Sequence, residues 1–307
     1  QSAAKFAEKT CAYACEDGYL LRRSDAMILM VLVVICYTIT SLNDKYAVSK
    51  AEMNGSQMTF VMAAATSFFM IFTLPFLNRT FEITPLSFVF IFLLLISKLL
   101  EFQMSARILV EMSAFELKAW LGICMFMSYF TDIILGNATF TALKILCVAI
   151  TAAGLIMIAK TGKKNVNYKK IVIPLILYLL SRYGYGIAVT WINKVGCISS
   201  DMALFAALII LAVILFPKSD IISLAKRKPK EVSIVALAKI PNVLGLILEN
   251  AVIAISLTND SFIQPMILIT ILIIGMFQKT ERPTGWNLAG GIICAVGILG
   301  FQFAGLV

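Results

Sequence analysis

Residues 26–47 of the chain read AMILMVLVVICYTITSLNDKYA, and this stretch decides the fold class. No charged side chain precedes Asp44 within it. A helix rises 1.5 Å per residue, so about 20 apolar residues are needed to cross roughly 30 Å of hydrocarbon. The stretch is long enough for that crossing. It therefore predicts a transmembrane helix that ends in the polar run Asn43-Asp44-Lys45.

The same pattern recurs along the chain and predicts ten membrane spans, five on each side of a basic linker. The first five lie at about residues 26–47, 56–77, 85–109, 113–135 and 139–159. The second five lie at about residues 171–193, 199–216, 232–257, 260–278 and 284–306. The chain accordingly divides into an N-terminal interfacial segment (1–25), a first five-helix repeat (26–160), a basic linker (161–170) and a second five-helix repeat (171–307).

The composition requires lipid as the solvent for most of the surface. Of the 307 residues, 60% are hydrophobic and only 14% are charged, against roughly 25% charged in an ordinary globular domain. The net charge of +9 is concentrated in short basic runs between apolar spans, such as residues 226–230. We interpret these runs as loops facing anionic headgroups of a lipid bilayer, and we expect no binding of nucleic acid.

Several kinds of chemistry find no support in the residues. The chain has no histidine, which removes the commonest metal ligand and the usual base of a nucleophile pair. Its seven cysteines are scattered and form no disulfide or metal framework. We expect no metal site and no cofactor. A nucleotide-binding loop of the G-x-x-x-x-G-K-S/T type is absent, so ATP is not expected to drive the protein directly.

The two halves carry similar residues at corresponding places. The first span ends in residues 42–47 (LNDKYA) and the sixth in residues 191–196 (WINKVG), each with Asn close to Lys. The fifth span contains residues 152–156 (AAGLI) and the tenth residues 295–299 (AVGIL). Because each half has an odd number of spans, the second half must enter the membrane from the opposite side. The result is an inverted repeat, which places a cavity between the halves.

This pattern resembles the drug/metabolite transporter superfamily in its EamA-like branch. The resemblance rests on the ten spans, the Asn and Lys at the exit of the first span, residues 279–283 (KTERP) and the glycine-rich run that follows them at 283–291 (PTGWNLAGG). The first half departs from the pattern at residues 135–138 (LGNA), where a Gly-Glu pair is usual. The resemblance implies a ten-helix permease with both termini in the cytoplasm. Basic residues are more frequent in the loops on the other side, and the positive-inside rule then places the termini outside.

Polar and ionisable residues within the spans are the candidates for function, because each costs several kcal/mol unless it faces a partner or a wet cavity. The predicted substrate-binding residues are Tyr37, Asn43, Lys98, Glu101, Gln103, Arg182, Tyr183, Trp191, Glu249, Asn250 and Gln264. We predict no catalytic residue among them. Two alternatives stay open from the residues alone. Lys98 and Glu101 can neutralise each other within one helix, and Arg182 can form an ion pair with Glu101, Glu249 or Asp132.

These observations predict a secondary transporter that moves a small organic metabolite, amino acid or drug by alternating access, with or without proton coupling. The alternative within transporters is a sugar-phosphate or nucleotide-sugar exchanger, which needs at least two of Arg182, Lys98 and Lys118 to face one cavity. An integral-membrane enzyme acting on lipids is the alternative from another class, but no D-x-x-D motif is present. We expect a multi-pass protein of the plasma (inner) membrane, monomeric or homodimeric, with a small-molecule solute as its partner.

Overall fold

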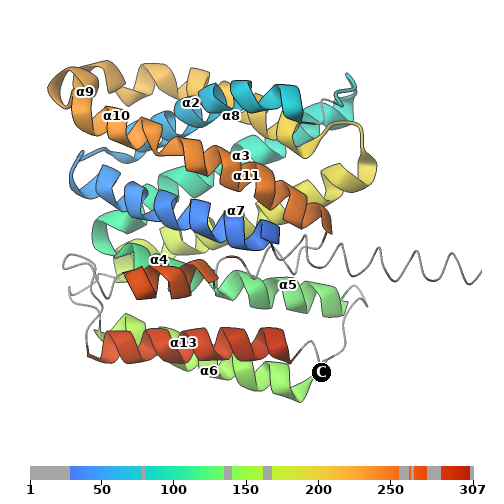
Figure 1. The fold of residues 1–307 in the computed structure, drawn as a ribbon, viewed down its shortest axis with the longest axis vertical. Helices are drawn as coiled ribbons and strands as arrows, with labels where there is room; N and C mark the ends of the chain where they lie inside the picture. Colours follow the sequence, from blue (N-terminus) through green and yellow to red (C-terminus); the bar gives the residue numbers. More distant parts are fainter. Residues whose placement is uncertain are drawn as a thin grey trace, which may run out of the picture.

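A computed structural model describes residues 28–77, 80–134, 140–161, 168–255, 263, 266–274 and 285–304. Apart from one isolated bridge between Phe81 and Ile198, the regular structure of these residues is helical (Figure 1). The predicted interfacial segment, most of the basic linker and Gln264 lie outside the described residues. So do residues 279–283, which supported the resemblance in the second half.

Six helices are long and apolar enough to cross a membrane. They are Ile28–Ser49, α2 (Gly55–Thr73), α3 (Pro85–Glu111), α7 (Tyr168–Val195), α8 (Ser200–Ser219) and the segment Pro229–Ala254, which comprises α10 (Pro229–Leu237) and most of α11 (Lys239–Ile255). The expectation of an all-α membrane protein is confirmed. The number of ten spans and their division into repeats stay predictions.

The remaining helices differ from the predicted spans in detail. The predicted fourth span is broken at Gly122 into α4 (Ala114–Leu121) and α5 (Ile123–Ile134). The predicted loop ahead of the eighth span contains α9 (Ile221–Arg227), and α10 begins three residues earlier than the predicted span. Near the ends of the two halves lie α6 (Ala142–Thr161) and α13 (Trp286–Phe303). Uniform hydrophobicity conceals such breaks, because an interrupted helix stays as apolar as a continuous one.

Capping side chains determine where several helices begin. Asn54 and Gln57 form a capping box at the start of α2, and Ser113 and Glu116 form one at the start of α4. Each box satisfies two backbone N–H groups that have no partner within the helix. Thr84 caps α3 ahead of Pro85. These caps fix where α2, α3 and α4 begin, and α3 and α4 carry several of the site residues described below.

Burial is the reverse of that in a soluble protein. Large apolar side chains such as Phe72, Phe92 and Val213 are more than half exposed, as expected where the surroundings are lipid tails. Lys98, Lys239 and Glu249, in contrast, are at most 1% exposed. These three charged groups therefore face the interior of the bundle, where other protein groups neutralise them.

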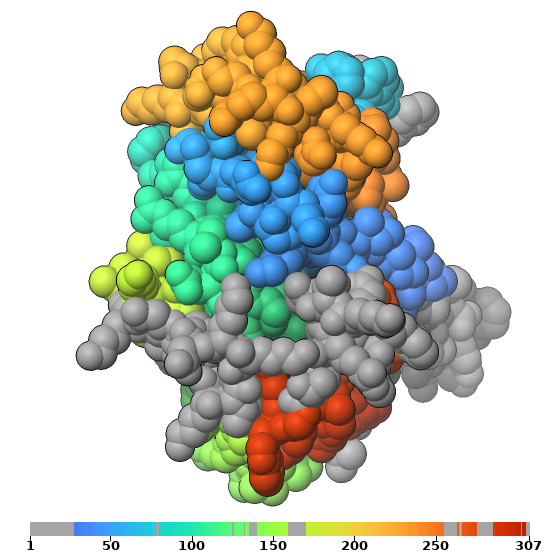
Figure 2. Space-filling view, turned by 90° about the vertical axis from the view of Figure 1, so that its left-hand side faces the viewer, coloured from blue at the N-terminus to red at the C-terminus, as the bar shows by residue number. Residues whose placement is uncertain are grey.

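The helices pack in two groups. In the larger one, α3 packs against α7 and α8, α2 packs against α3 and α8, and α11 packs against α2 and α7. In the other, α6 and α13 form a close pair that lies at one end of the molecule (Figures 1 and 2). Glycines permit this close approach. A Cβ added at Gly154 would lie 2.6 Å from the backbone nitrogen of Cys294, and one at Gly297 would lie 2.7 Å from that of Thr151.

Replacing Gly154 by alanine is expected to lower the thermal unfolding temperature in detergent. Backbone atoms surround the new methyl group and cannot rotate away, and overpacking of this kind costs about 1–3 kcal/mol. Gly184→Ala is the matched control, because its Cβ has no neighbouring atom within 4 Å and alanine is the better helix former. Equal unfolding temperatures for wild type and Gly154→Ala would show that the α6–α13 contact is looser than described.

Candidate functional site

Arg182 of α7 lies between two carboxylates from different helices. Its side chain is 8% exposed. One guanidinium nitrogen donates to Glu101 Oε1 of α3 at 3.1 Å, and the other donates to Glu249 Oε1 of α11. The planar guanidinium fork suits such a double contact. Arg182 therefore connects one helix of the first half of the chain with two helices of the second half.

Lys98 completes the charge balance around Glu101. Its ammonium group donates to Glu101 Oε2 at 2.8 Å across three residues of α3. The same nitrogen lies 3.8 Å from the ring centroid of Tyr185, an arrangement that stabilises a cation by its attraction to the ring. Both alternatives kept open above are therefore realised. Lys98 and Glu101 pair within their helix, and Arg182 pairs with Glu101 and Glu249.

Tyr37 joins the N-terminal helix Ile28–Ser49 to this cluster. Its hydroxyl donates to Glu249 Oε2 at 2.5 Å. Gly245, one helical turn before Glu249, leaves room for the ring, because a Cβ there would lie 2.8 Å from Tyr37 Cε1. The contact thus requires a glycine on the facing helix. Four helices now meet in one cluster of charged and polar groups.

Asn250 extends the polar contacts beyond the ion pairs. Tyr185 donates to Asn250 Oδ1 at 2.6 Å, and Asn250 Nδ2 donates to Asp201 Oδ1 of α8 at 2.8 Å. Lys98, which rests on the Tyr185 ring, links this chain to Glu101. The predicted residues Lys98, Glu101, Arg182, Glu249, Asn250 and Tyr37 therefore belong to one continuous network.

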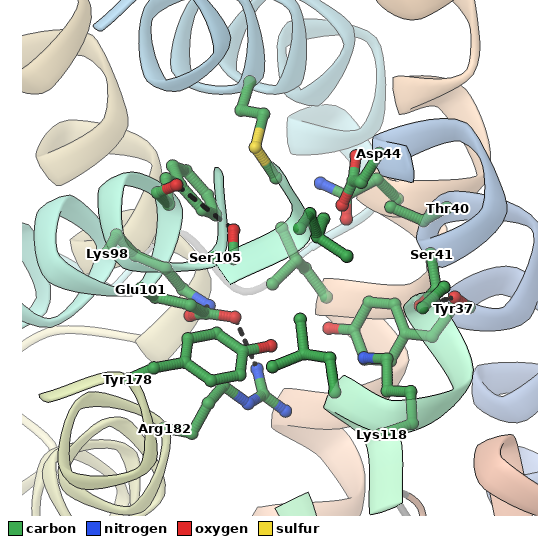
Figure 3. Close-up of a pocket in the computed structure, with 17 residues that line it drawn as sticks. Tyr37, Thr40, Ser41, Asp44, Lys98, Glu101, Ser105, Lys118, Tyr178 and Arg182 are labelled. Carbon is green, nitrogen blue, oxygen red and sulfur yellow. Dashed lines mark hydrogen bonds and ion pairs between the residues drawn. The ribbon is translucent and has the colours of Figure 1, made fainter. Parts of the chain in front are cut away.

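A cavity with about 610 Å³ of empty space, part of it open to solvent, lies beside the network (Figure 3). The N-terminal helix, α2, α3, α4, α7 and α11 contribute to its wall. Its charged and polar lining consists of Tyr37, Thr40, Ser41, Asp44, Lys98, Glu101, Ser105, Lys118, Tyr178, Arg182 and Asn242. Most of these side chains are seen around the open centre of Figure 3, with the Arg182–Glu101 contact drawn as a dashed line.

The opposite wall of the cavity contains a second buried ion pair. Lys239, which is 0% exposed, donates to Asp44 Oδ1 at 2.5 Å. Asn242, one turn further along α11, donates to Thr66 of α2 at 3.1 Å. Lys118 of α4 also lines the cavity. The cavity therefore combines three cationic side chains with carboxylates, hydroxyls and an apolar remainder, a set that suits a polar organic solute.

Six of the predicted site residues that the structure describes do not line this cavity. Two of them, Glu249 and Asn250, belong to the adjoining network, and the other four lie elsewhere. Asn43 donates weakly to the backbone oxygen of Val235 at 3.5 Å, and Tyr183 bonds the hydroxyl of Thr131. Trp191 is 61% exposed, and Gln103 is absent from the lining.

Sequence reasoning placed other lining residues outside the predicted site. Asp44 and Lys118 were visible as charges at or near span ends, and Tyr178 as an aromatic residue within the predicted sixth span. Their shared cavity follows only from the way α4, α7 and the N-terminal helix pack. Asn242 and Gly245 gave no distinguishing signal at all.

Loop contacts also join segments from the two halves of the chain. Lys228 forms an ion pair with Glu52 at 2.8 Å and donates to the backbone oxygen of Lys50. The hydrogen bond and charge of Lys228 lower the pKa of Glu52, so the pair persists above the ordinary glutamate pKa and is lost as pH falls through the lowered value. On another pair of loops, Glu82 donates its N–H to Cys197 and Ser199 to Thr80, both at 2.9 Å.

Comparison of the sequence with known protein families and with curated proteins finds no match. Within the described residues, no group of three His, Cys, Asp or Glu side chains could hold a metal ion. The chemistry of the site therefore has to be argued from its own geometry.

Removal of Arg182 is expected to destabilise the protein strongly. Arg182→Met leaves Glu249 buried without its cation, and breaking a buried pair in this way costs about 3–5 kcal/mol. Adding Glu249→Gln to that variant is expected to recover most of the loss, since Glu101 keeps Lys98 as a partner. Unfolding in detergent measures the stability of both variants, with Arg107→Met, at an exposed position of α3, as the control. A double variant no more stable than Arg182→Met would contradict the pairing.

Gly245 is expected to act through Tyr37. Gly245→Ala should destabilise the wild type by about 1–3 kcal/mol, because the new methyl group collides with the tyrosine ring. In a Tyr37→Ala background, the same change should cost much less. Thermal unfolding of the wild type, the two single variants and the double variant gives the coupling free energy between the two changes. If the two losses of stability simply add, Gly245 serves a contact other than the one with Tyr37.

Proposed function

We propose that the protein is a secondary transporter that moves a small organic solute across the membrane by alternating access. Its solute site is the cavity beside Arg182. The observation that carries this proposal is the position of the ion-paired network between two cavities. One is the cavity already described, and the other has about 740 Å³ of empty space, also partly open.

Residues along α7 and α11 support the separation of the two cavities. On α7, Tyr178 and Arg182 line the first cavity, whereas Ile192 and Asn193 line the second. On α11 the first cavity is lined by Asn242 and Leu246, and the second by Asn250 and Ala254. Residues 242 and 254 lie about 18 Å apart along a helix. The order is the same on both helices. Arg182 is the last residue of α7 that lines the first cavity, and Glu249 lies within one turn of the boundary on α11.

A layer between cavities that face opposite ways is what alternating access requires. Arg182, Glu101 and Glu249 bind α3, α7 and α11 together, and Tyr37 adds the N-terminal helix. A solute that crosses this layer must displace these contacts. If the contacts open toward one cavity while they close toward the other, the protein works as a carrier. A permanently open channel would not need a buried salt-bridge layer across its path.

The same layer fits the proposed inverted repeat. In the ten-span scheme, α3 is the third span and α11 belongs to the eighth, so they are equivalent elements of the two halves. Glu101 and Glu249 then occupy related places, and Arg182 joins them near the pseudo-twofold axis. Transporters built from inverted repeats hold their substrates at such an interface. The EamA-like resemblance and a plasma-membrane location belong to this proposal, as does a monomeric or homodimeric state without a cofactor.

Solute counterflow in reconstituted vesicles tests the proposal. A stabilising solute is first found by thermal-shift screening of the purified full chain against metabolites, and its labelled form is then exchanged against an internal unlabelled pool. Glu249→Gln is expected to reduce counterflow at least tenfold, because it weakens the contact of Arg182 with α11 and unbalances the layer. Lys144→Gln, outside the cavity, should leave the rate unchanged.

Two outcomes would overturn this assignment. The first is a stabilising solute that shows no counterflow in vesicles containing folded protein. The second is conversion of a lipid to a product without solute flux, which would favour the membrane-enzyme alternative. If the counterflow rate is unaffected by Glu249→Gln, the assignment as a transporter stands, but the contacts of Arg182 with the two carboxylates are not part of its mechanism.

A further inference from the structure

A seam of polar contacts joins the N-terminal helix, with the turn that follows it, to the segment α10–α11, and the two lie side by side in Figure 1. Three side-chain pairs form the seam, and residue numbers rise along one segment as they fall along the other: Tyr37 with Glu249, Asp44 with Lys239 and Glu52 with Lys228. Thr40 and Ser41 line the first cavity from one side of the seam, and Asn242 lines it from the other. Separation of the two segments would therefore open this wall of the cavity.

The carboxylates of the three pairs become more exposed toward one end of the seam. The exposed fraction of the side chain is 0% for Glu249, 14% for Asp44 and 73% for Glu52. Water competes with an exposed ion pair and leaves it little net stabilisation, whereas breaking a buried pair is costly. The seam is therefore weakest at Glu52 and strongest at Glu249.

Backbone geometry places both members of the weakest pair at corners of the chain. Glu52 has a φ of 55°, in the left-handed region, and its neighbours Ala51 and Met53 are buried. These buried neighbours hold a conformation that glutamate otherwise avoids. Pro229 disfavours helical geometry at Lys228, which has a φ of −134° and separates α9 from α10. The backbone therefore sets the two charged side chains opposite each other.

A break in the helix separates α10 from α11. α10 ends at Leu237 and α11 begins at Lys239. Pro241 has no N–H group to donate to the carbonyl of Leu237, four residues earlier, and this accounts for the break at Ala238. The ion pair of Lys239 with Asp44 fixes the start of α11. Rotation about Ala238 therefore moves α10 while α11 stays in place.

The loops beside the second cavity are joined differently. Ser199 donates its N–H to the backbone oxygen of Thr80 at 2.9 Å, next to the bridge between Phe81 and Ile198. Thr80, Ile198 and Ser199 all line that cavity. A backbone contact of this kind breaks only when a loop moves, whereas rotation of one side chain breaks the outermost pair of the seam. The contact that opens most readily therefore belongs to the first cavity.

We propose that the seam is the gate of the first cavity, with the Glu52–Lys228 pair as its latch and Ala238 as its hinge. The inference rests on the proposed transport function, which requires this wall to open during each cycle. Release of the latch frees α10 to rotate away from the turn at Glu52. Water then reaches Asp44 and Lys239 and weakens their ion pair, and the two segments separate beside the cavity.

Labelling of a reporter cysteine in the cavity tests the gate without any solute. Ser105→Cys places the thiol in the cavity wall. The purified full chain in phosphatidylcholine nanodiscs is treated with N-ethylmaleimide, and mass spectrometry measures labelling at that position. Lys228→Glu is expected to raise the rate about two- to fivefold, the range that an exposed ion pair permits, because two carboxylates then repel each other. Adding Glu52→Lys should restore the original rate, and Lys230→Glu, the same charge change at an exposed neighbour, should leave it unchanged.

Cross-linking of the latch tests the gate during transport. Glu52→Cys and Lys228→Cys are combined, oxidised to a disulfide in reconstituted vesicles and assayed by counterflow of the solute found in the thermal-shift screen. Counterflow should fall about tenfold or more, because a fixed lid blocks the conformational step, and a reductant should restore it. Each single variant, oxidised in the same way, controls for the natural cysteines and should keep its rate.

The two measurements separate the gate from the transport function. Equal labelling rates in the wild-type latch and in Lys228→Glu, or full counterflow in the cross-linked protein, would overturn the gate. Full counterflow after cross-linking would at the same time support transport. The expected labelling pattern in a protein without any counterflow would support the opening of the cavity wall but refute transport.

Discussion

The contact of Arg182 with two carboxylates is the interaction on which the rest of the structure depends. In the interior of a membrane bundle, neither the guanidinium group nor Glu101 and Glu249 can rely on water, so each helix that carries one of them is held where its partner lies. That requirement sets the relative positions of α3, α7 and α11. Tyr37 then adds the N-terminal helix through Glu249. The cavity is a consequence of this arrangement, because four helices that converge on buried charges cannot also fill the space beside them with apolar side chains.

Packing elsewhere follows a different rule, because lipid tails are as apolar as the helix surfaces they touch. Hydrophobicity therefore gives little drive for helices to associate in the bilayer, and close backbone contact takes over part of that role. The α6–α13 pair shows this in the contacts of Gly154 with Gly290 and Cys294. Gly245 serves a related purpose next to Tyr37, where it makes room for an aromatic ring instead of another helix. Small residues thus determine both where helices approach and where a polar contact can form.

The sequence predicted the helical membrane class and most of the ionic network, and the physical reason is the same for both. A charge within an apolar span is conspicuous, so Lys98, Glu101, Arg182 and Glu249 could be selected without any structure. Their pairing could not be derived, because residues 101, 182 and 249 are distant in sequence and meet only through helix packing. Arg182 was one possible partner of Glu249 from the sequence, and the contact between α7 and α11 realises that alternative. The break at Gly122 and helix α9 were missed because neither changes the average hydropathy. Trp191 was selected for its ring, but its side chain lies on the exposed surface.

In the proposed transporter, the network has to be strong enough to define a fold and weak enough to open, and its composition suits both demands. A purely apolar layer would close the bundle by side-chain packing alone. A polar solute could not replace those packing contacts with hydrogen bonds or ion pairs of its own. An ion-paired layer differs, since a solute carrying a carboxylate or phosphate offers Arg182 the same type of hydrogen bond that Glu101 or Glu249 provides. The free-energy difference between the closed layer and the solute-bound layer is then small although each is stabilised by strong contacts. A ligand shifts a conformational equilibrium only through such a difference in interactions. In the proposed mechanism, buried charge at this position connects the stability of the bundle with its change of conformation.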